Sequence, residues 1–233
     1  MVSQRRKRRV ILMVVLLIFL IIALVVNFPK ATQPKKPNVV KTTSESSSLA
    51  IEALKSLAIK GRAPKTGYSR TQFGDGWAIS GGCDTRNKIL YRDLIDAKVD
   101  KKCNVTSGIL NDPYTGKTIN FVRGSKASGA VQIDHAVALS DAWQKGAQKL
   151  SLERRTELAN DPLELLAVDG QANQQKSDGD AATWLPSNKA FRCQYVARQV
   201  AVKQKYVLWV TRAEFNVILT ILSGCAGQRL PNL

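Results

Sequence analysis

The chain has 233 residues, of which 44% are hydrophobic and 6% aromatic. This length and composition allow a sizeable core and exclude a generally disordered protein. The formal net charge at pH 7 is +17, and five of the positive charges lie within residues 5–9. Residues 30–48 carry a net three more, which leaves nine for the rest of the chain. This excess favours polyanionic partners such as nucleic acid, anionic lipid or acidic wall polymers, without choosing among them.

The N-terminal segment predicts a membrane anchor. Residues 10–26, VILMVVLLIFLIIALVV, are uncharged and follow the basic run RRKRR. As a helix they would span about 25 Å, at the short end of the range for crossing a bilayer. The positive flank would stay in the cytoplasm and send the rest of the chain across. We therefore expect a cytoplasmic basic segment at residues 1–9 and a transmembrane signal anchor at 10–28 of a single-pass protein of the cell membrane. The alternative is secretion after signal-peptide cleavage, although the flank shows no clean small-residue cleavage step.

Residues 29–48 are rich in Pro, Lys, Ser and Thr and predict a flexible linker, followed by an extracytoplasmic domain at 49–233. Apolar spacing predicts a helix over 49–61 and another over 84–97, with Asp84 as its N-cap. Two short strands are expected at 104–110 and 118–124, separated by the turn NDPYTGK. No internal repeat is visible.

The second half of the domain predicts strands and helices in alternation. Residues 131–139, VQIDHAVAL, form a strand, and helices follow that begin at Ser140 and Ser151. Residues 163–168, LELLAV, predict a second strand, which the turn dipeptide Asp169-Gly170 closes before a short helix over 171–178. Two further helices are expected over 187–206 and 211–223.

Four cysteines lie beyond the apolar segment: Cys83, Cys103, Cys193 and Cys225. Their even number and the predicted outside location favour two disulfides, for which three pairings are possible. Proximity in the sequence favours Cys83 with Cys103 and Cys193 with Cys225. A zinc site of four thiolates is the alternative, but no Cys-x-x-Cys pair supports it.

The stretch VQIDHAVALSDAW contains the only histidine of the chain, His135, directly after Asp134. Hydrolysis of a phosphodiester needs a base that activates water and a cation that neutralises charge on the phosphate. A hard cation such as Mg²⁺ prefers oxygen ligands and keeps several waters, so two side chains can hold it, here Asp134 and Asn173. Because side chains alternate along a strand, Asp134 and His135 should point to opposite faces unless the strand is distorted.

These motifs resemble the HNH endonuclease superfamily. IDHAVALSDAW, the strand and turn LLAVDG and the helix motif NQQK occur together in the expected order, with the core at residues 131–178. The closest branch shares the C-terminal domain of GmrSD-type restriction endonucleases, and the resemblance covers about residues 68–225. It implies an α+β fold whose ββα-metal (HNH) nuclease core is surrounded by helices, and the transmembrane helix predicted above would precede this domain.

The resemblance also implies roles for individual residues. Asp134 and Asn173 would bind a divalent metal, for which Mg²⁺ is expected, and His135 would be the general base. Lys176, one helical turn after Asn173, would meet a phosphate. Glu164 stands where the family's pattern has an asparagine that braces the histidine loop. An ionised glutamate accepts hydrogen bonds but cannot donate them, so this departure places activity in question.

Other side chains are weaker candidates. Asn160, one helical turn before Glu164, could brace the histidine loop in its place. Asp178 and Asp180 could be extra metal ligands, although Asp-Gly-Asp more often forms a turn. Lys189 and Arg192 could bind phosphate or simply be solvated.

The leading hypothesis is therefore a membrane-anchored, extracytoplasmic, metal-dependent HNH-type endonuclease. Its substrate would be nucleic acid, with DNA favoured over RNA, and the basic surface would concentrate it. The sequence identifies no protein partner. One alternative is a catalytically degenerate nuclease fold that binds nucleic acid or cell-wall polymer, which Glu164 motivates. Another is a structural envelope protein that uses only the anchor and the disulfides.

Overall fold

A computed structural model describes residues 13, 17, 18, 49–124 and 129–231. The chain divides into two units, Met1–Ser44 and Glu45–Leu233. In the first, only Met13, Leu17 and Ile18 are described, as exposed helical residues. The predicted segments 1–9, 10–28 and 29–48 otherwise lie outside the described residues. Among the residues that are described, no helix is long and apolar enough to cross a membrane.

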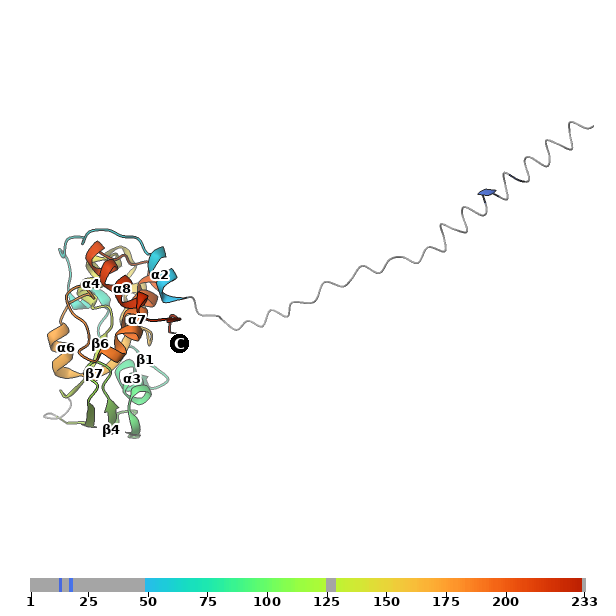
Figure 1. Ribbon diagram of the computed structural model, residues 1–233. Helices are drawn as coiled ribbons and strands as arrows, with labels where there is room; N and C mark the ends of the chain where they lie inside the picture. The colour runs from blue at the N-terminus through green and yellow to red at the C-terminus, as the bar shows by residue number, and fades with distance from the viewer. Residues whose placement is uncertain (1–12, 14–16, 19–48, 125–128, 232–233) are drawn as a thin grey trace, which may run out of the picture. The chain divides into compact units, whose positions relative to one another are not determined.

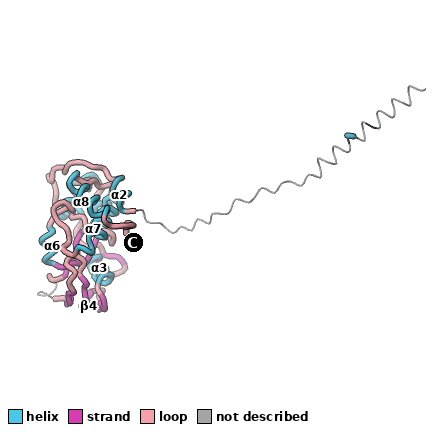
Figure 2. The backbone as a smooth tube through the Cα atoms, in the orientation of Figure 1, coloured by secondary structure: helices cyan, strands magenta, loops and turns pink. Residues whose placement is uncertain are grey.

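The second unit is an α+β structure with small antiparallel sheets and seven α-helices in its described part. Its N-terminal half contains helix α2 (Ala50–Ser56), the short 3-10 helix η1 (Arg70–Phe73) and helix α3 (Thr85–Asp93). Strands β1 (Ile79–Ser80) and β2 (Cys83–Asp84) form a small hairpin. A three-stranded antiparallel sheet then combines β3 (Ile95–Val99), β4 (Val105–Asn111) and β5 (Thr118–Val122). This sheet lies at the opposite end of the unit from α2 and α8 (Figure 1; Figure 2).

The centre of the unit is a two-stranded antiparallel sheet and a helix. Strand β6 (Val131–His135) pairs with β7 (Leu165–Asp169), and helix α6 (Gly170–Lys176) follows directly and contacts both strands. Helix α4 (Leu139–Gln144), the 3-10 helix η2 (Ala147–Lys149) and helix α5 (Leu152–Asn160) are inserted between the two strands. The fold thus brings β6 together with β7 and α6, although the inserted helices separate β6 from them in the sequence.

The C-terminal part is helical and covers this centre. After the 3-10 helix η3 (Lys189–Phe191), helix α7 (Arg192–Lys205) and helix α8 (Arg212–Ser223) pack on each other and on α2. One face of the β6–β7 pair gives Leu166 and Val168 to this helical core. The other face gives Val131 and Ile133, with their β7 neighbours, to a core with α3 and β4–β5. The pair is therefore buried on both faces.

Most predicted elements are present, with differences that have local causes. The first helix ends at Ser56 instead of Gly61 because Ile59 leaves it to form a parallel bridge with Val210. Asp84 caps α3 as predicted, but the helix ends at Asp93, and the expected helical residues after Leu94 form β3. Helix α4 begins at Leu139 without a side-chain cap, so Ser140 is not its N-cap.

The cysteines form the two disulfides that proximity predicts. Cys83 is bonded to Cys103, and Cys193 to Cys225. The first joins the small hairpin to the turn between β3 and β4, and the second joins α7 to the end of α8. The thiolate zinc alternative is therefore wrong, because all four sulfurs are used in these bonds.

Candidate active site

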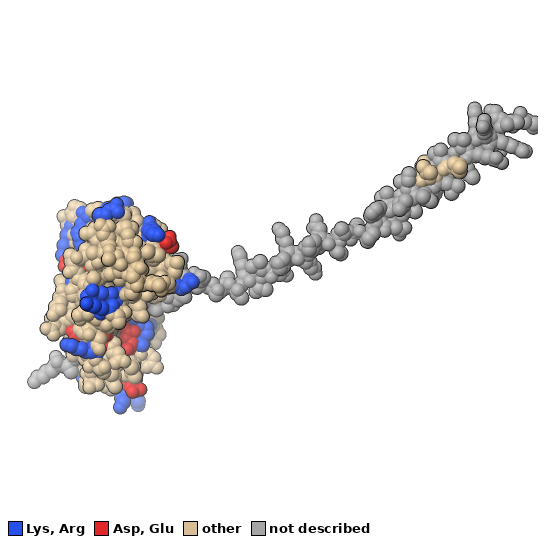
Figure 3. Space-filling view, viewed as in Figure 1, with Lys and Arg blue, Asp and Glu red and all other residues tan. Residues whose placement is uncertain are grey.

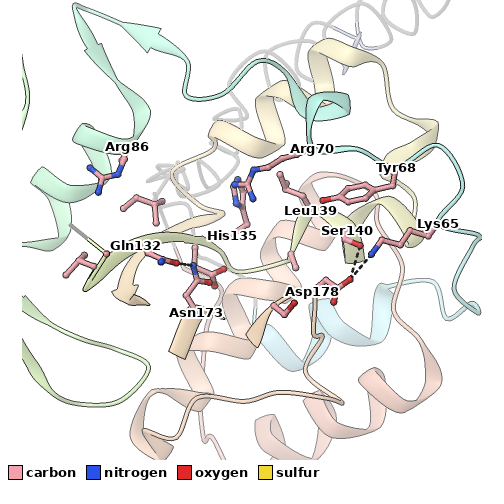
Figure 4. A pocket seen from close by; sticks show the side chains of 16 residues that line it. Lys65, Tyr68, Arg70, Arg86, Gln132, His135, Leu139, Ser140, Asn173 and Asp178 are labelled. Carbon is pink, nitrogen blue, oxygen red and sulfur yellow. Dashed lines mark hydrogen bonds and ion pairs between the residues drawn. The ribbon is translucent and has the colours of Figure 1, made fainter. Parts of the chain in front are cut away.

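Strand β6 carries the Asp134–His135 pair along an open edge. Its pairing with β7 is regular from Val131 to His135, so neither a bulge nor a curl brings the two side chains to one face. Among the described residues the β6–β7 sheet has two strands, and no third strand pairs with the second edge of β6. A cavity of about 590 Å³ lies there, lined by all five residues of β6 and by Asn173 (Figure 4). Asp134 and His135 point to opposite faces of the strand, as predicted. Both can still line one cavity, because side chains from both faces of a strand can reach its edge.

Asp169 and Gly170 fix helix α6 against this strand. Asp169 is the N-cap of α6, and its carboxylate accepts a 2.7 Å hydrogen bond from the Ala172 backbone N–H. Gly170 is the first helical residue, and a Cβ at that position would lie 2.0 Å from the carbonyl oxygen of Gly129. The dipeptide predicted as a turn is thus a helix cap followed by a glycine that the close approach of the backbones requires.

The imidazole of His135 is buried and has a defined tautomer. Its Nε2 lies 3.0 Å from the carbonyl oxygen of Ala159, at the end of α5. Because a carbonyl can only accept, Nε2 carries the proton and Nδ1 keeps its lone pair. Burial lowers the pKa of His135 to about 3, with the charges of Arg70 and Lys176 adding to the effect and the Ala159 bond opposing it. The ring is therefore neutral near pH 7, as a general base must be.

Trp77 holds the other side of the imidazole. Its ring lies parallel to that of His135, with 5.7 Å between the centroids and 8° between the planes. Asn160 fixes the Trp77 loop, because its Oδ1 accepts a 2.8 Å bond from the Ala78 N–H. Asn160 was expected to brace the loop after His135. It instead braces the loop of Trp77, whose ring stacks on His135.

The carboxylate of Asp134 is held from two sides. Tyr114 donates its hydroxyl to one oxygen, and the ammonium of Lys176 lies 3.0 Å from the other. Lys176 also donates a 2.8 Å bond to the carbonyl oxygen of His135, and its side chain is fully buried. Burial, with the Asp134 charge beside it, raises the pKa of Tyr114 well above its usual value, so the phenol remains a donor. The predicted phosphate contact of Lys176 remains a prediction, and here its ammonium has two protein partners.

Asn173 is positioned to offer an oxygen ligand. Its Nδ2 donates a 2.9 Å hydrogen bond to Oε1 of Gln132, a residue on the same face of β6 as Asp134 (Figure 4). The described residues give its Oδ1 no hydrogen bond. No group of three or more His, Cys, Asp or Glu side chains in the described parts of the chain could hold a metal ion. One carboxylate and one amide oxygen fit a hard cation that keeps most of its waters.

Glu164 braces the segment that follows His135. Its two carboxylate oxygens lie 3.2 and 3.1 Å from the Val137 N–H, and its backbone carbonyl accepts a bond from Ala136. The side chain is fully buried, and this burial raises the pKa of Glu164 well above its usual value. The residue that departs from the family pattern thus accepts a backbone bond at the histidine loop.

The remaining predicted side chains have other partners or lie outside the cavity. Asp178 lines the cavity but is bonded to Lys65 and Ser140. Asp180 instead forms ion pairs with buried or half-buried cations, among them Lys145 at 2.7 Å. Lys189 and Arg192 do not line the cavity, and the Arg192 guanidinium donates to the carbonyl of Pro186. Their proposed phosphate contacts stay predictions that the geometry does not favour.

Several residues around the site were not predicted. Tyr114 lies in the predicted turn NDPYTGK, and Arg70 and Trp77 lie between the helices predicted over 49–61 and 84–97. Arg86 lies on α3 two residues after the cap. Each comes from a segment far from Asp134 in the chain, and no local pattern marks it. The resemblance, which spans residues 68–225, includes all four without assigning them a role.

Comparisons with known proteins find a matching family and a relative. The family described as the C-terminal domain of GmrSD restriction endonucleases matches residues 84–221. An uncharacterized secreted protein of Arthroderma benhamiae is 36% identical over 205 residues, which cover 87% of this chain and 95% of that protein. No solved structure matches the chain.

Proposed function

Because this chain belongs to the family of the GmrSD restriction endonuclease C-terminal domain, which is of the HNH-nuclease kind, we propose that it is a metal-dependent HNH-type endonuclease. Its substrate would be nucleic acid, and DNA is favoured. The family membership by itself supports a nuclease-type function. The observation that supports the finer proposal is the neutral imidazole of His135, which shares one cavity with Asp134 and Asn173 and whose Nδ1 has no hydrogen-bond partner among the described residues.

The proposed reaction begins with a water molecule next to His135. Nδ1 accepts a proton from this water, whose oxygen forms the new bond to phosphorus. The bond from phosphorus to the leaving sugar oxygen breaks, and that oxygen takes a proton from solvent. The Ala159 carbonyl and the Trp77 ring hold the imidazole in one orientation throughout. A positioned general base of this kind contributes roughly 10²- to 10⁴-fold to the rate.

Asp134 and Asn173 would hold the divalent cation, expected to be Mg²⁺. When bound, it would neutralise charge on the phosphoryl and leaving oxygens. Tyr114 and Lys176 orient the Asp134 carboxylate, and Gln132 orients the Asn173 amide. Glu164 keeps the backbone after His135 in place through Val137. In this arrangement Glu164 takes the bracing role of the asparagine by accepting a hydrogen bond.

We also propose that the enzyme acts outside the cytoplasm. Its two disulfides are bonds that persist in oxidising surroundings, and the Arthroderma relative is a secreted protein by its name. The proposal covers both membrane anchorage and release after cleavage. The net charge suits a polyanion in either case, since nine excess positive charges lie beyond residue 48, and Figure 3 shows several separate groups of Lys and Arg on the visible face.

The direct test is plasmid cleavage by the full chain in mild detergent with Mg²⁺. We expect cutting that EDTA stops and that His135→Ala lowers by at least about 10²-fold. Unchanged cutting by His135→Ala would refute the mechanism. Salt-sensitive binding without cutting under Mg²⁺ or Mn²⁺ would instead support the catalytically degenerate binding protein, and Glu164→Asn would then test whether the departure is the cause.

A further inference from the structure

The cavity beside β6 contains two arginines without acidic partners. Arg70 and Arg86 both line it, and neither forms an ion pair or a side-chain hydrogen bond in the described parts of the chain. By contrast, Lys65 at the same cavity is paired with Asp178 at 3.0 Å. In Figure 4, Arg86 and Lys65 lie on opposite sides of the cavity, and Arg70 and His135 lie between them.

Arg86 occupies a place where its positive charge is unfavourable. It is half-buried on α3, and burial together with the nearby charge of Arg123 lowers the pKa of Arg86. The closest acid in the sequence, Asp84, uses both carboxylate oxygens to accept hydrogen bonds from Asn87. A bound anion would stabilise the charged form of Arg86, and by linkage the charged form would favour binding of an anion.

Arg70 lies next to the proposed base. Figure 4 shows Arg70 beside His135, and both side chains line the cavity. Arg70, His135 and Leu139 also line a second cavity of about 370 Å³, so the Arg70 side chain borders both cavities. A phosphate that receives a water activated by His135 would therefore lie within reach of Arg70.

We propose that Arg70 binds the scissile phosphate and Arg86 binds a neighbouring phosphate of the same polynucleotide strand. This inference rests on the proposed nuclease function and names two substrate-binding residues for it. The guanidinium group suits this role because its planar fork of N–H donors matches phosphate oxygens. A strand bound in this way would follow the open edge of β6 from the α3 side of the cavity toward η1.

Two substrates separate the roles of the arginines. A DNA oligonucleotide has scissile and neighbouring phosphates, whereas bis(p-nitrophenyl) phosphate has only one phosphodiester. Arg70→Ala should lower kcat/KM about tenfold or more for both. Arg86→Ala should lower kcat/KM for the oligonucleotide about tenfold more than for the small ester, mainly by raising KM for the oligonucleotide. Arg86→Lys, which keeps the charge, should recover part of this loss.

The matched control is Lys88→Ala, which removes an exposed cation two residues after Arg86 on the same helix. Oligonucleotide binding to the His135→Ala protein provides a second readout that needs no catalysis. There, Arg86→Ala should reduce the slope of log K against log salt by about 1, and Lys88→Ala should not. If Arg86→Ala and Lys88→Ala give the same difference between the two substrates and the same salt slope, the role of Arg86 is overturned.

The role of Arg70 is overturned if Arg70→Ala cuts both substrates at the wild-type rate. If the wild-type chain cuts neither substrate, the proposed activity fails, and the salt slopes of binding still decide whether Arg70 and Arg86 hold phosphates. A circular dichroism melt of each variant identifies any loss that comes from unfolding.

Discussion

Two groups of charges in this protein are built in opposite ways. Behind helix α4, three acids and three bases form the buried ion cluster, whose members are Arg62, Asp141, Lys145, Asp180, Lys203 and Glu214. The Lys145 ammonium lies within 2.7 Å of a carboxylate oxygen of each of the three acids. Every charge in this cluster has an opposite charge beside it.

The cavity beside β6 lacks this balance. Asp134 has a buried lysine and a phenol as partners, while Arg70 and Arg86 have no acid within ion-pair distance in the described residues. Burying an unpaired charge is costly, so a folded domain keeps one only where solvent or a ligand can reach it. The cluster thus holds α4, α7 and α8 together, whereas exposed Arg70 and half-buried Arg86 remain accessible to solvent and to the phosphates proposed for them.

The strongest test of this contrast is Lys145→Met in the buried ion cluster. The substitution leaves Asp141, Asp180 and Glu214 with too little positive charge, and the break of a buried pair typically costs about 4 kcal/mol. We expect the free energy of unfolding, measured in urea, to fall by about this amount. Lys88→Met, at an exposed position, should change it by less than about 0.5 kcal/mol. Equal stabilities of the two variants would show that the cluster does not support the fold.

A smaller loss is expected for Lys176→Met at the edge of the cavity. This change leaves Asp134 buried with only Tyr114 as a donor, and we expect a loss of about 3 kcal/mol in the free energy of unfolding. Adding Asp134→Asn should recover part of it, because the unpaired charge is then removed. Lys189→Met, an exposed lysine outside the cavity, serves as the control. If the stability losses of the two single variants simply add in the double variant, Asp134 and Lys176 do not stabilise each other.

The lone histidine permits a direct measurement of its ionisation. The pKa of His135 is about 3 in the folded chain and near the ordinary 6.5 in the unfolded chain. Below pH 6.5 the unfolded chain therefore binds a proton that the folded chain does not, so the free energy of unfolding falls as the pH falls toward 3. Between pH 6.5 and 5 this loss amounts to about 2 kcal/mol. NMR of the untagged chain should show one imidazole that is protonated at Nε2 and does not titrate between pH 8 and 5. Arg70→Gln should raise its pKa, and titration near 6.5 in the wild type would contradict the buried, stacked geometry.

Much of this structure could be predicted from local sequence. The caps Asp84 and Ser151, the turn between β4 and β5 and the nearness of the cysteines in each pair are short-range signals. The fold predicted for residues 131–178, two strands and a helix with an inserted helical pair, agrees with the elements observed. The motif order also led to the family that the comparison shows.

The surroundings of the site depend on contacts that no local pattern encodes. Tyr114 reaches Asp134 across 20 residues, and Asn160 reaches Ala78 across 82. The resemblance gives Lys176 a phosphate contact, yet the fold places its ammonium beside the buried carboxylate of Asp134. Arg70 and Arg86 were not predicted because the sequence alone does not show which side chains lie next to a given arginine.

The smallest expected effect concerns the ring that stacks on His135. Asn160→Ala removes the 2.8 Å bond to the Ala78 N–H, for which we expect about 1 kcal/mol of lost stability. A looser Trp77 loop would weaken the stacking, so the ring-current shift on the His135 imidazole should decrease and kcat should fall several-fold. Asn216→Ala, at an exposed position on α8, is the control. If kcat and the imidazole shift both stay at their wild-type values, the orientation of the base depends on the Ala159 carbonyl alone, and the Trp77 loop belongs with the structural part of the protein.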